Sequence, residues 1–337
     1  MNYIVEGHQF KHEAQTAIQV FYPMDRYILC DHVSELGMTI VSSLKDNYAE
    51  CIVFSSGVEI IRDWAEAEPN SDKSVQRHAV RLSIHNALKR LTGYNPPWGV
   101  LTGIRPAKIA GELYKRGLSK AQTVDVFYNK YKALSEKGEL ACRVYEAESR
   151  ILKQYKGSSL YIGIPFCPAK CLYCSFTSFP LKPNTSQKQE YLRALVLELR
   201  YLGELLSNKK LDTIYIGGGT PTTLAPDELE MLFSEIEHSF SLDGLKEYTV
   251  EAGRPDTIDE QKLDVMKKHN ISRISINPQT MNNETLKLIG RTHSMEQCKD
   301  AFIMARKLGF NNINMDIILG LPGEGVKEVE NTLKEIE

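Results

Sequence analysis

Five short apolar runs alternate with longer amphipathic stretches from about residue 158 to the end of the chain. The runs predict strands at Leu160–Ile164, Thr213–Ile216, Glu247–Glu251, Arg273–Ile276 and Ile313–Ile318. Helical spacing of apolar residues predicts helices at Gln187–Leu206, Pro226–Phe240, Ile258–His269, Ser294–Lys307 and Val326–Ile336. Strands that alternate with helices are typical of parallel βα units. The predicted fold class is therefore α/β, with chemistry expected on the loops at the carboxyl ends of the strands.

The first 155 residues follow a different pattern, in which predicted strands precede predicted helices. The strands are predicted at Asn2–Glu6, Ala17–Tyr22, Met38–Ser43 and Glu50–Phe54. The helices are predicted from Ser74 to the Thr92–Pro97 stretch, from Ser119 with Gln122 as a capping box, and from Lys137 to Tyr155. We therefore expect a smaller α+β domain over residues 1–155, followed by the α/β domain over residues 156–337.

The last predicted helix reaches Glu337, and no sixth strand follows it in this sequence. An apolar face on that helix would then have no later element to cover it. We expect a partial (βα) barrel that is truncated before its sixth strand, and hence an inactive fragment of a longer protein. A complete five-unit domain is the alternative.

Composition excludes several classes of protein. The chain has 41 Lys and Arg against 43 Asp and Glu, and 42% of its residues are hydrophobic. These values are those of a globular protein, and they exclude a disordered chain, a collagen-like fibre and a generally basic nucleic-acid binder. The sequence has neither an apolar run long enough for a membrane span nor a signal-peptide pattern, so we expect a cytoplasmic protein.

Three of the seven cysteines, Cys167, Cys171 and Cys174, lie together just after the first strand of the α/β domain. The spacing Cys-x3-Cys-x2-Cys allows one loop to hold an iron–sulfur cube and to leave one iron without a protein ligand. A zinc site is an alternative, although the next histidine along the chain is the distant His238. Chance clustering of buried thiols is another. We favour the iron–sulfur cluster.

A glycine-rich turn follows the second predicted strand of the same domain. It runs Gly217-Gly218-Gly219-Thr220-Pro221. Glycines at this place allow the backbone to approach a ligand closely. The turn has neither the Gly-Lys-Ser/Thr of a P-loop nor the Gly-x-Gly-x-x-Gly of a dinucleotide site. It therefore indicates a different ligand beside the cysteine loop.

With these motifs the chain resembles the radical S-adenosylmethionine (SAM) enzymes, and more narrowly the oxygen-independent coproporphyrinogen III oxidase (dehydrogenase) family. The resemblance extends over about residues 158–337, through motifs that lie at Tyr161–Cys167, Gly217–Thr222, Ser275–Thr280, Leu288–His293 and Asn314–Gly323. Three further segments resemble the HemZ-like branch of that family, which carries an extra N-terminal domain; they are Cys171–Phe176, Val250–Pro255 and Pro97–Pro106.

The resemblance implies two cofactors, a [4Fe–4S] cluster and SAM, and a role for each matching residue. Cys167, Cys171 and Cys174 would hold the cluster, and SAM would chelate its open iron. The residues implied to contact SAM are Tyr161 and Tyr173 near the adenine and the cluster, Gly218 and Gly219 at the methionyl group, and Glu251, Gln279, Arg291 and Asp316 from the later strands. We assign no further catalytic residue.

The reaction implied is reductive cleavage of SAM, with an electron from a flavodoxin- or ferredoxin-like donor, followed by hydrogen abstraction from a propionate side chain. Loss of CO2 and an electron would leave a vinyl group, and two rounds would convert coproporphyrinogen III to protoporphyrinogen IX. Two positions depart from the oxidase pattern: Gly163 replaces a histidine, and Phe176 replaces a further cysteine. Branches without those two residues include a haem chaperone, which is the alternative function.

A basic stretch lies in the N-terminal domain. Between Asp72 and Glu112 it contains seven cations and no acid, namely Lys73, Arg77, Arg81, Lys89, Arg90, Arg105 and Lys108. An anionic partner such as porphyrin carboxylates, another protein or nucleic acid would fit it, and a zinc-bound RNA-interaction module is a third hypothesis. We favour a solvated basic face and do not expect a nucleic-acid partner.

Overall fold

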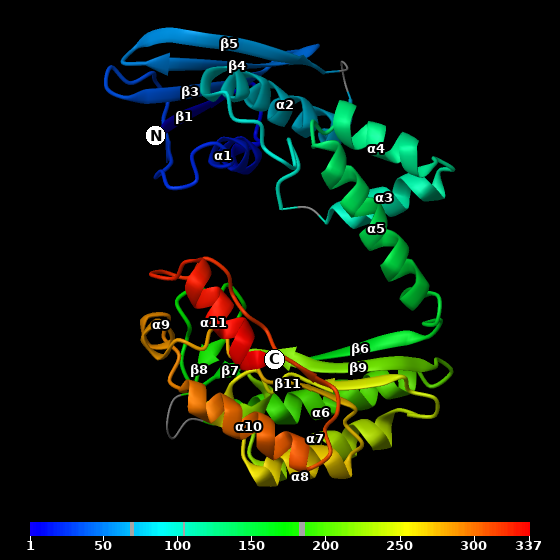
Figure 1. Cartoon of the computed structure of the whole chain (residues 1–337). Coiled ribbons are helices and arrows are strands. Elements are labelled where there is room, and N and C mark those ends of the chain that lie inside the picture. The colour runs from blue at the N-terminus through cyan, green and yellow to red at the C-terminus, as the bar shows by residue number, and fades with distance from the viewer. Residues whose placement is uncertain (68–70, 104, 182–185) are drawn as a thin grey trace. The chain divides into compact units, whose positions relative to one another are not determined.

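The computed structural model describes residues 1–67, 71–103, 105–181 and 186–337. The chain divides into two compact units, Met1–Gln154 and Tyr155–Glu337, which are treated separately below (Figure 1). Across the described ranges, no helix combines the length and the apolar character that a membrane crossing needs.

The first unit contains a five-stranded sheet in the order β2-β1-β3-β4-β5. Its strands are β1 (Asn2–Glu6), β2 (Ile28–Leu29), β3 (Met38–Leu44), β4 (Tyr48–Ser55) and β5 (Val58–Glu66). β1 is parallel to β2 and β3, whereas β3, β4 and β5 are antiparallel. Two helices, α1 (Lys11–Gln19) and α2 (Lys73–Thr92), bury Ile18, Ile84 and Leu88 in one core with Ile40 and Val53 of the sheet.

The strand predicted at Ala17–Tyr22 is wrong, because this segment contains the end of α1 and the turn that follows it. Ala14, Ala17 and Ile18 are buried at positions i, i+3 and i+4, which is the spacing of a helical face. Gly93, at φ 69°, ends α2 as the sequence predicts. The sequence reading did not predict β5.

Three further helices complete the first unit. They are α3 (Pro106–Lys115), α4 (Lys120–Asn129) and α5 (Ser135–Leu152). α4 begins with the predicted capping box between Ser119 and Gln122. These helices enclose a second core around Phe127, Ala133 and Cys142. The sequence reading missed α3, and it placed α5 two residues late.

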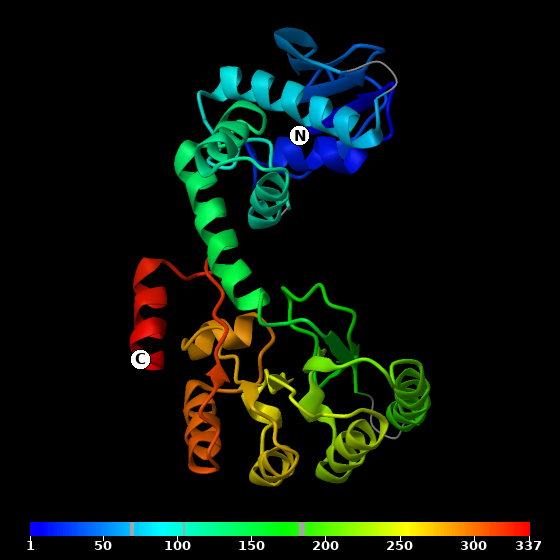
Figure 2. The ribbon, with the colours of Figure 1, turned by 90° about the vertical axis from the view of Figure 1, so that its right-hand side faces the viewer.

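The second unit contains five parallel strands in the order β12-β11-β10-β9-β6, so the predicted α/β architecture is confirmed. The strands are β6 (Ser158–Ile164), β9 (Leu211–Gly218), β10 (Glu247–Val250), β11 (Arg273–Ser275) and β12 (Ile313–Asn314). Figures 1 and 2 show helices along one face of this sheet. They are α6 (Gln187–Leu205), α7 (Pro226–Ser239), α8 (Glu260–Lys268) and α10 (Met295–Lys307).

Two shorter helices, α9 (Asn283–Leu288) and α11 (Val326–Ile336), lie in the C-terminal part of the second unit. The strand predicted at Ile313–Ile318 is wrong beyond Asn314. The chain leaves the sheet after β12, and pairing resumes only at the isolated bridge between Gln279 and Ile317. The segment therefore forms a bent loop beside the carboxyl ends of the strands.

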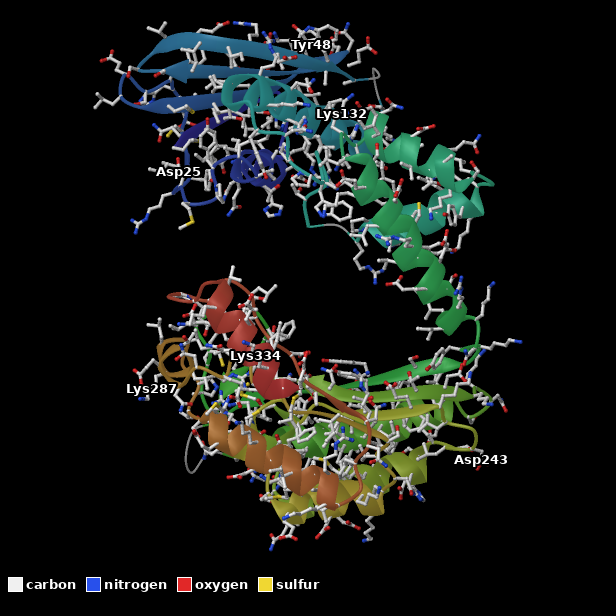
Figure 3. All side chains as sticks on the ribbon, viewed as in Figure 1. Asp25, Tyr48, Lys132, Asp243, Lys287 and Lys334 are labelled. Atoms are coloured by element: carbon white, nitrogen blue, oxygen red, sulfur yellow. The ribbon has the colours of Figure 1, made fainter. Side chains whose placement is uncertain are left out.

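Strand polarity determines at which end of the second unit the motif-bearing loops lie. Asp243, in the turn before β10, lies at one end of this unit, and Lys287 of α9 lies at the other (Figure 3). In β6, Leu160, Ile162 and Ile164 are buried in the core with the helices, whereas Tyr161 is 63% exposed on the opposite face. The loops that follow the strands gather at the Lys287 end.

Candidate functional site

The cysteine loop leaves the end of β6 and is held by backbone hydrogen bonds. Cys167 lies in β7 (Phe166–Cys167), which pairs with β8 (Phe179–Pro180). The N–H of Leu172 donates to the carbonyl of Ile289 at 3.0 Å. Cys167 is buried, while Cys171 and Cys174 are partly exposed. All three thiols line one cavity of about 140 Å³.

The same cavity is lined from the carboxyl end of every strand of the sheet. Ten of the eleven residues predicted for the site line it, and they are Cys167, Cys171, Cys174, Tyr173, Gly218, Gly219, Glu251, Gln279, Arg291 and Asp316. The remaining one, Tyr161, lines a neighbouring pocket of about 470 Å³ on the exposed face of the sheet. Parallel strands place their following loops at one edge, which explains how Cys167 and Asp316, about 150 positions apart, line one cavity.

Two observations test whether this cavity fits an iron–sulfur cluster. A Cβ at Gly219 would lie 2.6 Å from the Phe166 carbonyl oxygen and 3.0 Å from Cys167 Sγ, so the cradle needs glycine there. Within the described ranges, no three His, Cys, Asp or Glu side chains converge as ligands of a single metal ion. Thiolates of a cluster bind separate irons, whereas zinc ligands converge on one point. The three thiols of one loop, with Gly219 leaving room beside Cys167, fit a cluster that keeps one iron free of protein ligands.

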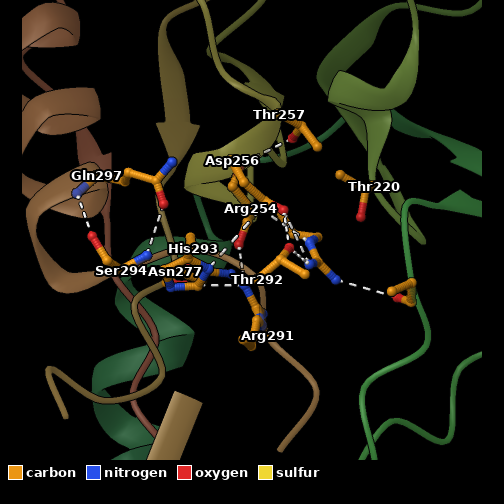
Figure 4. Close-up of polar contacts among 12 residues, drawn as sticks. Thr220, Arg254, Asp256, Thr257, Asn277, Arg291, Thr292, His293, Ser294 and Gln297 are labelled. Atoms are coloured by element: carbon orange, nitrogen blue, oxygen red, sulfur yellow. Dashed lines mark hydrogen bonds and ion pairs between the residues drawn. The ribbon is translucent and has the colours of Figure 1, made fainter. Parts of the chain in front are cut away.

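Arg254 is the most highly connected side chain at the cavity (Figure 4). It is 3% exposed, and its Nη1 donates to the Ala169 carbonyl at 3.2 Å and to Cys171 Sγ at 3.7 Å. Nε and Nη2 bind the two carboxylate oxygens of Asp256 at 3.2 and 3.1 Å, and Nη2 also donates to Thr292 Oγ1. Arg254 thus fixes the backbone between the first two cysteines.

Asp256 remains the anionic partner of Arg254. Burial raises its pKa, but the hydrogen bonds from Arg254 and Thr292 outweigh this and hold the pKa below its usual value. Next to it, burial together with the charge of Arg291 lowers the pKa of His293 to about 4. His293 is therefore a neutral imidazole at pH 7.

Arg291 is buried and is held by oxygen atoms of the protein. Its Nη1 donates to the carbonyls of Gly253 at 3.0 Å and Asn277 at 3.3 Å, which joins the ends of β10 and β11. Its Nε and Nη2 donate to the Tyr173 hydroxyl at 3.2 and 3.1 Å. Arg291 therefore positions Tyr173, which follows the second cysteine by two residues, in the wall of the cavity.

Glu251 lies where the cysteine cavity meets the neighbouring pocket, because it lines both. Burial raises the pKa of its carboxyl, the N–H of Gly218 lowers it, and Asp316 raises it. In the neighbouring pocket the rings of Tyr161 and Tyr215 are stacked, with centroids 5.8 Å apart and an angle of 11°. An aromatic surface thus adjoins the cysteine cavity.

The loops after β11 and β12 are tied to each other. Gln279 is 7% exposed and adopts a φ of 66°, which is uncommon for a residue with a side chain. Its N–H donates to the Asp316 carbonyl at 3.0 Å, and the Asp316 N–H donates to Asn277 Oδ1 at 3.2 Å. These bonds hold Gln279 and Asp316 together at the cavity.

A family model, that of the Radical SAM superfamily, matches residues 161–336, which include every residue predicted for the site. The chain belongs to the radical SAM superfamily. Members of this superfamily use a [4Fe–4S] cluster and SAM, and Cys167, Cys171 and Cys174 remain the predicted ligands of such a cluster in this chain.

Several curated relatives of this radical SAM chain have names that refer to haem metabolism. The oxygen-independent coproporphyrinogen-III oxidase-like protein HemZ of Bacillus subtilis is 44% identical over 259 residues, which is 75% of this chain and 52% of HemZ. The haem chaperone HemW of B. subtilis is 36% identical over 176 residues, 52% of this chain and 46% of HemW. The chain therefore spans about half the length of these relatives.

A solved structure of the coproporphyrinogen III oxidase HemN of Escherichia coli, described as a radical SAM enzyme, superposes with a TM-score of 0.50 at 27% identity. The match covers 57% of this chain and 44% of HemN. It agrees with the parallel sheet of the second unit.

Sequence reasoning assigned no role to several residues of the radical SAM site. Arg254, Asp256 and Thr292 form the network described above, and Thr220 Oγ1 lies 3.4 Å from Cys167 Sγ. Thr220 and Arg254 follow strand ends and belong to the motifs Gly217–Thr222 and Val250–Pro255. Their positions in the sequence could therefore have indicated a place at the site. Thr292 is the unspecified position within the Leu288–His293 motif, and Asp256 lies one residue beyond the Val250–Pro255 motif, so neither was singled out.

Proposed function

We propose that this radical SAM chain is an oxidoreductase that decarboxylates propionate side chains of coproporphyrinogen III to vinyl groups, giving protoporphyrinogen IX. One structural observation carries the proposal: the cysteine-lined cavity and the aromatic pocket share three lining residues, Phe176, Gly218 and Glu251. A substrate in the aromatic pocket would thus lie next to the cofactor site. The likeness to HemZ supports the choice of substrate class.

In this proposal the residues of the chain divide into two groups. Cys167, Cys171 and Cys174 hold the cluster, which together with SAM supplies one electron and a strong acceptor for a hydrogen atom. Gly218, Gly219, Tyr173, Glu251, Gln279, Arg291 and Asp316 surround SAM, as their common cavity suggests. Tyr161 and Tyr215 offer their stacked rings to an apolar ring system.

A propionate of the substrate would need a cation, and Arg273 is a candidate on the same face of the sheet. Its charge lowers the pKa of the nearby Tyr215 phenol, although burial and Glu251 raise that pKa to about 12 overall. Arg273 donates from Nη1 to Glu247 Oε1 at 3.5 Å and from Nη2 to Asn314 Oδ1 at 3.1 Å. These two bonds fix the position of its guanidinium. A guanidinium held in this way is suited to a carboxylate.

The electron balance of the reaction defines the partners. Each propionate loses one hydrogen atom, CO2 and one further electron, so the reaction needs a one-electron acceptor. Cleavage of SAM needs a one-electron donor, for which we propose a protein of the flavodoxin or ferredoxin type.

A haem-binding chaperone is the second candidate function. Gly163 and Phe176 both line the aromatic pocket, so no histidine or cysteine is present at these two places. The nearest atom to a Cβ at Gly163 would be Tyr161 Cε1 at 3.6 Å, so the pocket is open beside Gly163. The likeness to HemW favours this candidate.

The test uses the chain reconstituted with iron and sulfide without oxygen. Iron and acid-labile sulfide are counted, and the electron spin resonance of the reduced protein is recorded with and without SAM. The protein is then incubated with coproporphyrinogen III, SAM and reduced flavodoxin, and products are separated by mass. Vinyl products that are absent from a Cys167→Ala control support the oxidoreductase. SAM cleavage without vinyl products, together with stoichiometric haem binding, contradicts it and supports the chaperone.

A further inference from the structure

The first unit contains a cavity of about 340 Å³ that the proposed function does not use. It lies between the first turns of α2, the segment that leads into α3, and the end of α4. Its size is that of a pocket for a small organic molecule. Apolar side chains form part of its wall, namely Val75, Val100, Leu101 and Ile109.

The charged side chains that line this cavity are mostly cationic. Arg81, Arg105, Lys108 and Lys130 face a single carboxylate, that of Glu112. None of these four cations makes an ion pair with a described residue. Arg81 lies in α2, Arg105 is the N-cap of α3, and Lys130 is the C-cap of α4. The cations therefore come together only when the unit folds.

Of the four cations, Arg81 gives the strongest indication that the cavity binds an anion. Its Nε is buried and has no hydrogen-bond partner. Glu13, whose charge acts on Arg81 from outside the cavity, is already paired with Arg77 at 3.1 Å. A buried guanidinium nitrogen without a partner is unfavourable, and an anion in the cavity would relieve this. The neighbouring His78 is neutral at pH 7, because burial lowers its pKa to about 4, helped by the charges of Lys130 and Arg81.

Backbone hydrogen bonds hold the part of the cavity wall that contains Val100 against the end of α4. The N–H of Val100 donates to the Tyr131 carbonyl, and the N–H of Leu134 donates to the Pro97 carbonyl, both at 2.9 Å. Gly99 has a φ of 56°, and a Cβ there would lie 2.1 Å from the Tyr131 oxygen. Residues 97–101 are thereby fixed against the end of α4, where Val100 and Leu101 form one side of the cavity.

We propose that this cavity binds a small organic dianion, with a phosphate monoester or a dicarboxylate head on the four cations and an apolar body on Val75, Leu101 and Ile109. Four cations against one carboxylate match two or more negative charges better than one. The cavity is a pocket of limited volume inside one unit, which favours a small molecule over a nucleic-acid strand.

The test is calorimetric titration of the full chain with four probes: AMP, inorganic phosphate, succinate and the uncharged adenosine. We expect AMP or succinate to bind and adenosine to bind at least tenfold more weakly, since a charge-assisted hydrogen bond contributes about a factor of ten or more. Which of AMP and succinate binds more tightly distinguishes a phosphate head from a dicarboxylate head.

Arg81→Gln and Lys108→Gln should each weaken binding about tenfold. Because Lys108 is exposed, its replacement should leave the fold intact. Lys108→Gln therefore tests the proposal even if the Arg81→Gln variant does not fold. Arg77→Gln is the matched control, because Arg77 lies one turn before Arg81 but pairs with Glu13 outside the cavity. An equal loss in Arg77→Gln, equal binding of AMP and adenosine, or no binding of any anion at millimolar concentration overturns the proposal. So does a short RNA that binds more tightly than AMP through the same residues.

Discussion

Arg254 donates a hydrogen bond from Nη1 to the sulfur of Cys171, at a distance of 3.7 Å. The guanidinium is oriented for this contact by Asp256, which binds it through both carboxylate oxygens. A positive group that donates to a cluster thiolate stabilises the more negative, reduced state of an iron–sulfur cluster. The contact therefore links the end of β10 to the redox properties expected of the site.

Replacement of Arg254 by Gln should lower the reduction potential of the reconstituted cluster. We expect a shift on the order of 50 mV, since 59 mV corresponds to a tenfold change in a one-electron equilibrium. The measurement is a potentiometric titration followed by electron spin resonance. Arg200→Gln is the control, because Arg200 pairs with Glu235 on the helical side of the sheet. Equal potentials for the wild type and Arg254→Gln would show that the contact has no electronic role.

Removal of one thiol should abolish cluster assembly, because three cysteines are needed to hold three irons. We expect the iron and sulfide bound by Cys167→Ala to fall to background after reconstitution. Cys298→Ala should keep its full cluster, since Cys298 is a fully buried thiol of α10 whose pKa burial raises to about 11. Iron and sulfide counts on the two purified variants check this. Normal loading of Cys167→Ala would remove Cys167 from the ligand set.

A methyl group at Gly219 should disturb the cysteine loop directly. The new Cβ would be 2.6 Å from the Phe166 carbonyl oxygen, so the backbone or Cys167 must move. We expect Gly219→Ala to lose about 1–3 kcal/mol of stability, as overpacked sites do, and to bind less than half of the wild-type iron. Gly163→Ala is the matched control, because its nearest neighbour would be 3.6 Å away. Thermal melting and iron counts distinguish the two variants.

The sequence predicted the second unit well because its elements follow directly from apolar periodicity. β6, β9, β10 and β11 lie where the runs place them, and a loop motif follows each strand on the same edge. The network around Arg254 could not be predicted in this way. Its hydrogen bonds to Ala169 and Thr292 span 85 and 38 residues, and spacing along the chain carries no information about such contacts.

The errors in the first unit have physical causes. The segment around Ala17 and Ile18 is short, and an apolar run of that length fits a strand or a helix equally well until its burial is known. In β5 the apolar and polar residues alternate only weakly, because β5 is an edge strand and most of its side chains are exposed. The cavity around Arg81 depends on three segments that meet only in the folded unit, so the sequence showed its cations but not their convergence.

His85 in α2 should make the first unit less stable at acidic pH. Burial lowers its pKa to about 4, with help from Lys89 and Lys132, and neither ring nitrogen has a hydrogen-bond partner. The unfolded chain, with an ordinary histidine pKa near 6.5, binds the proton first as the pH falls. Unfolding is therefore favoured progressively as the pH falls from about 6.5 to about 4, and the loss is on the order of 2 kcal/mol.

His85→Leu should remove this contribution, so that its free energy of unfolding falls less between pH 7 and pH 4.5 than that of the wild type. Both tryptophans, Trp64 and Trp98, belong to the first unit, so urea unfolding followed by tryptophan fluorescence reports on this unit. His12→Leu, at an exposed position of α1, is the control and should keep the wild-type pH dependence. If His85→Leu and the wild type lose the same stability at pH 4.5, the proton is taken up elsewhere in the unit, and His78, whose pKa burial also lowers to about 4, is the next residue to replace.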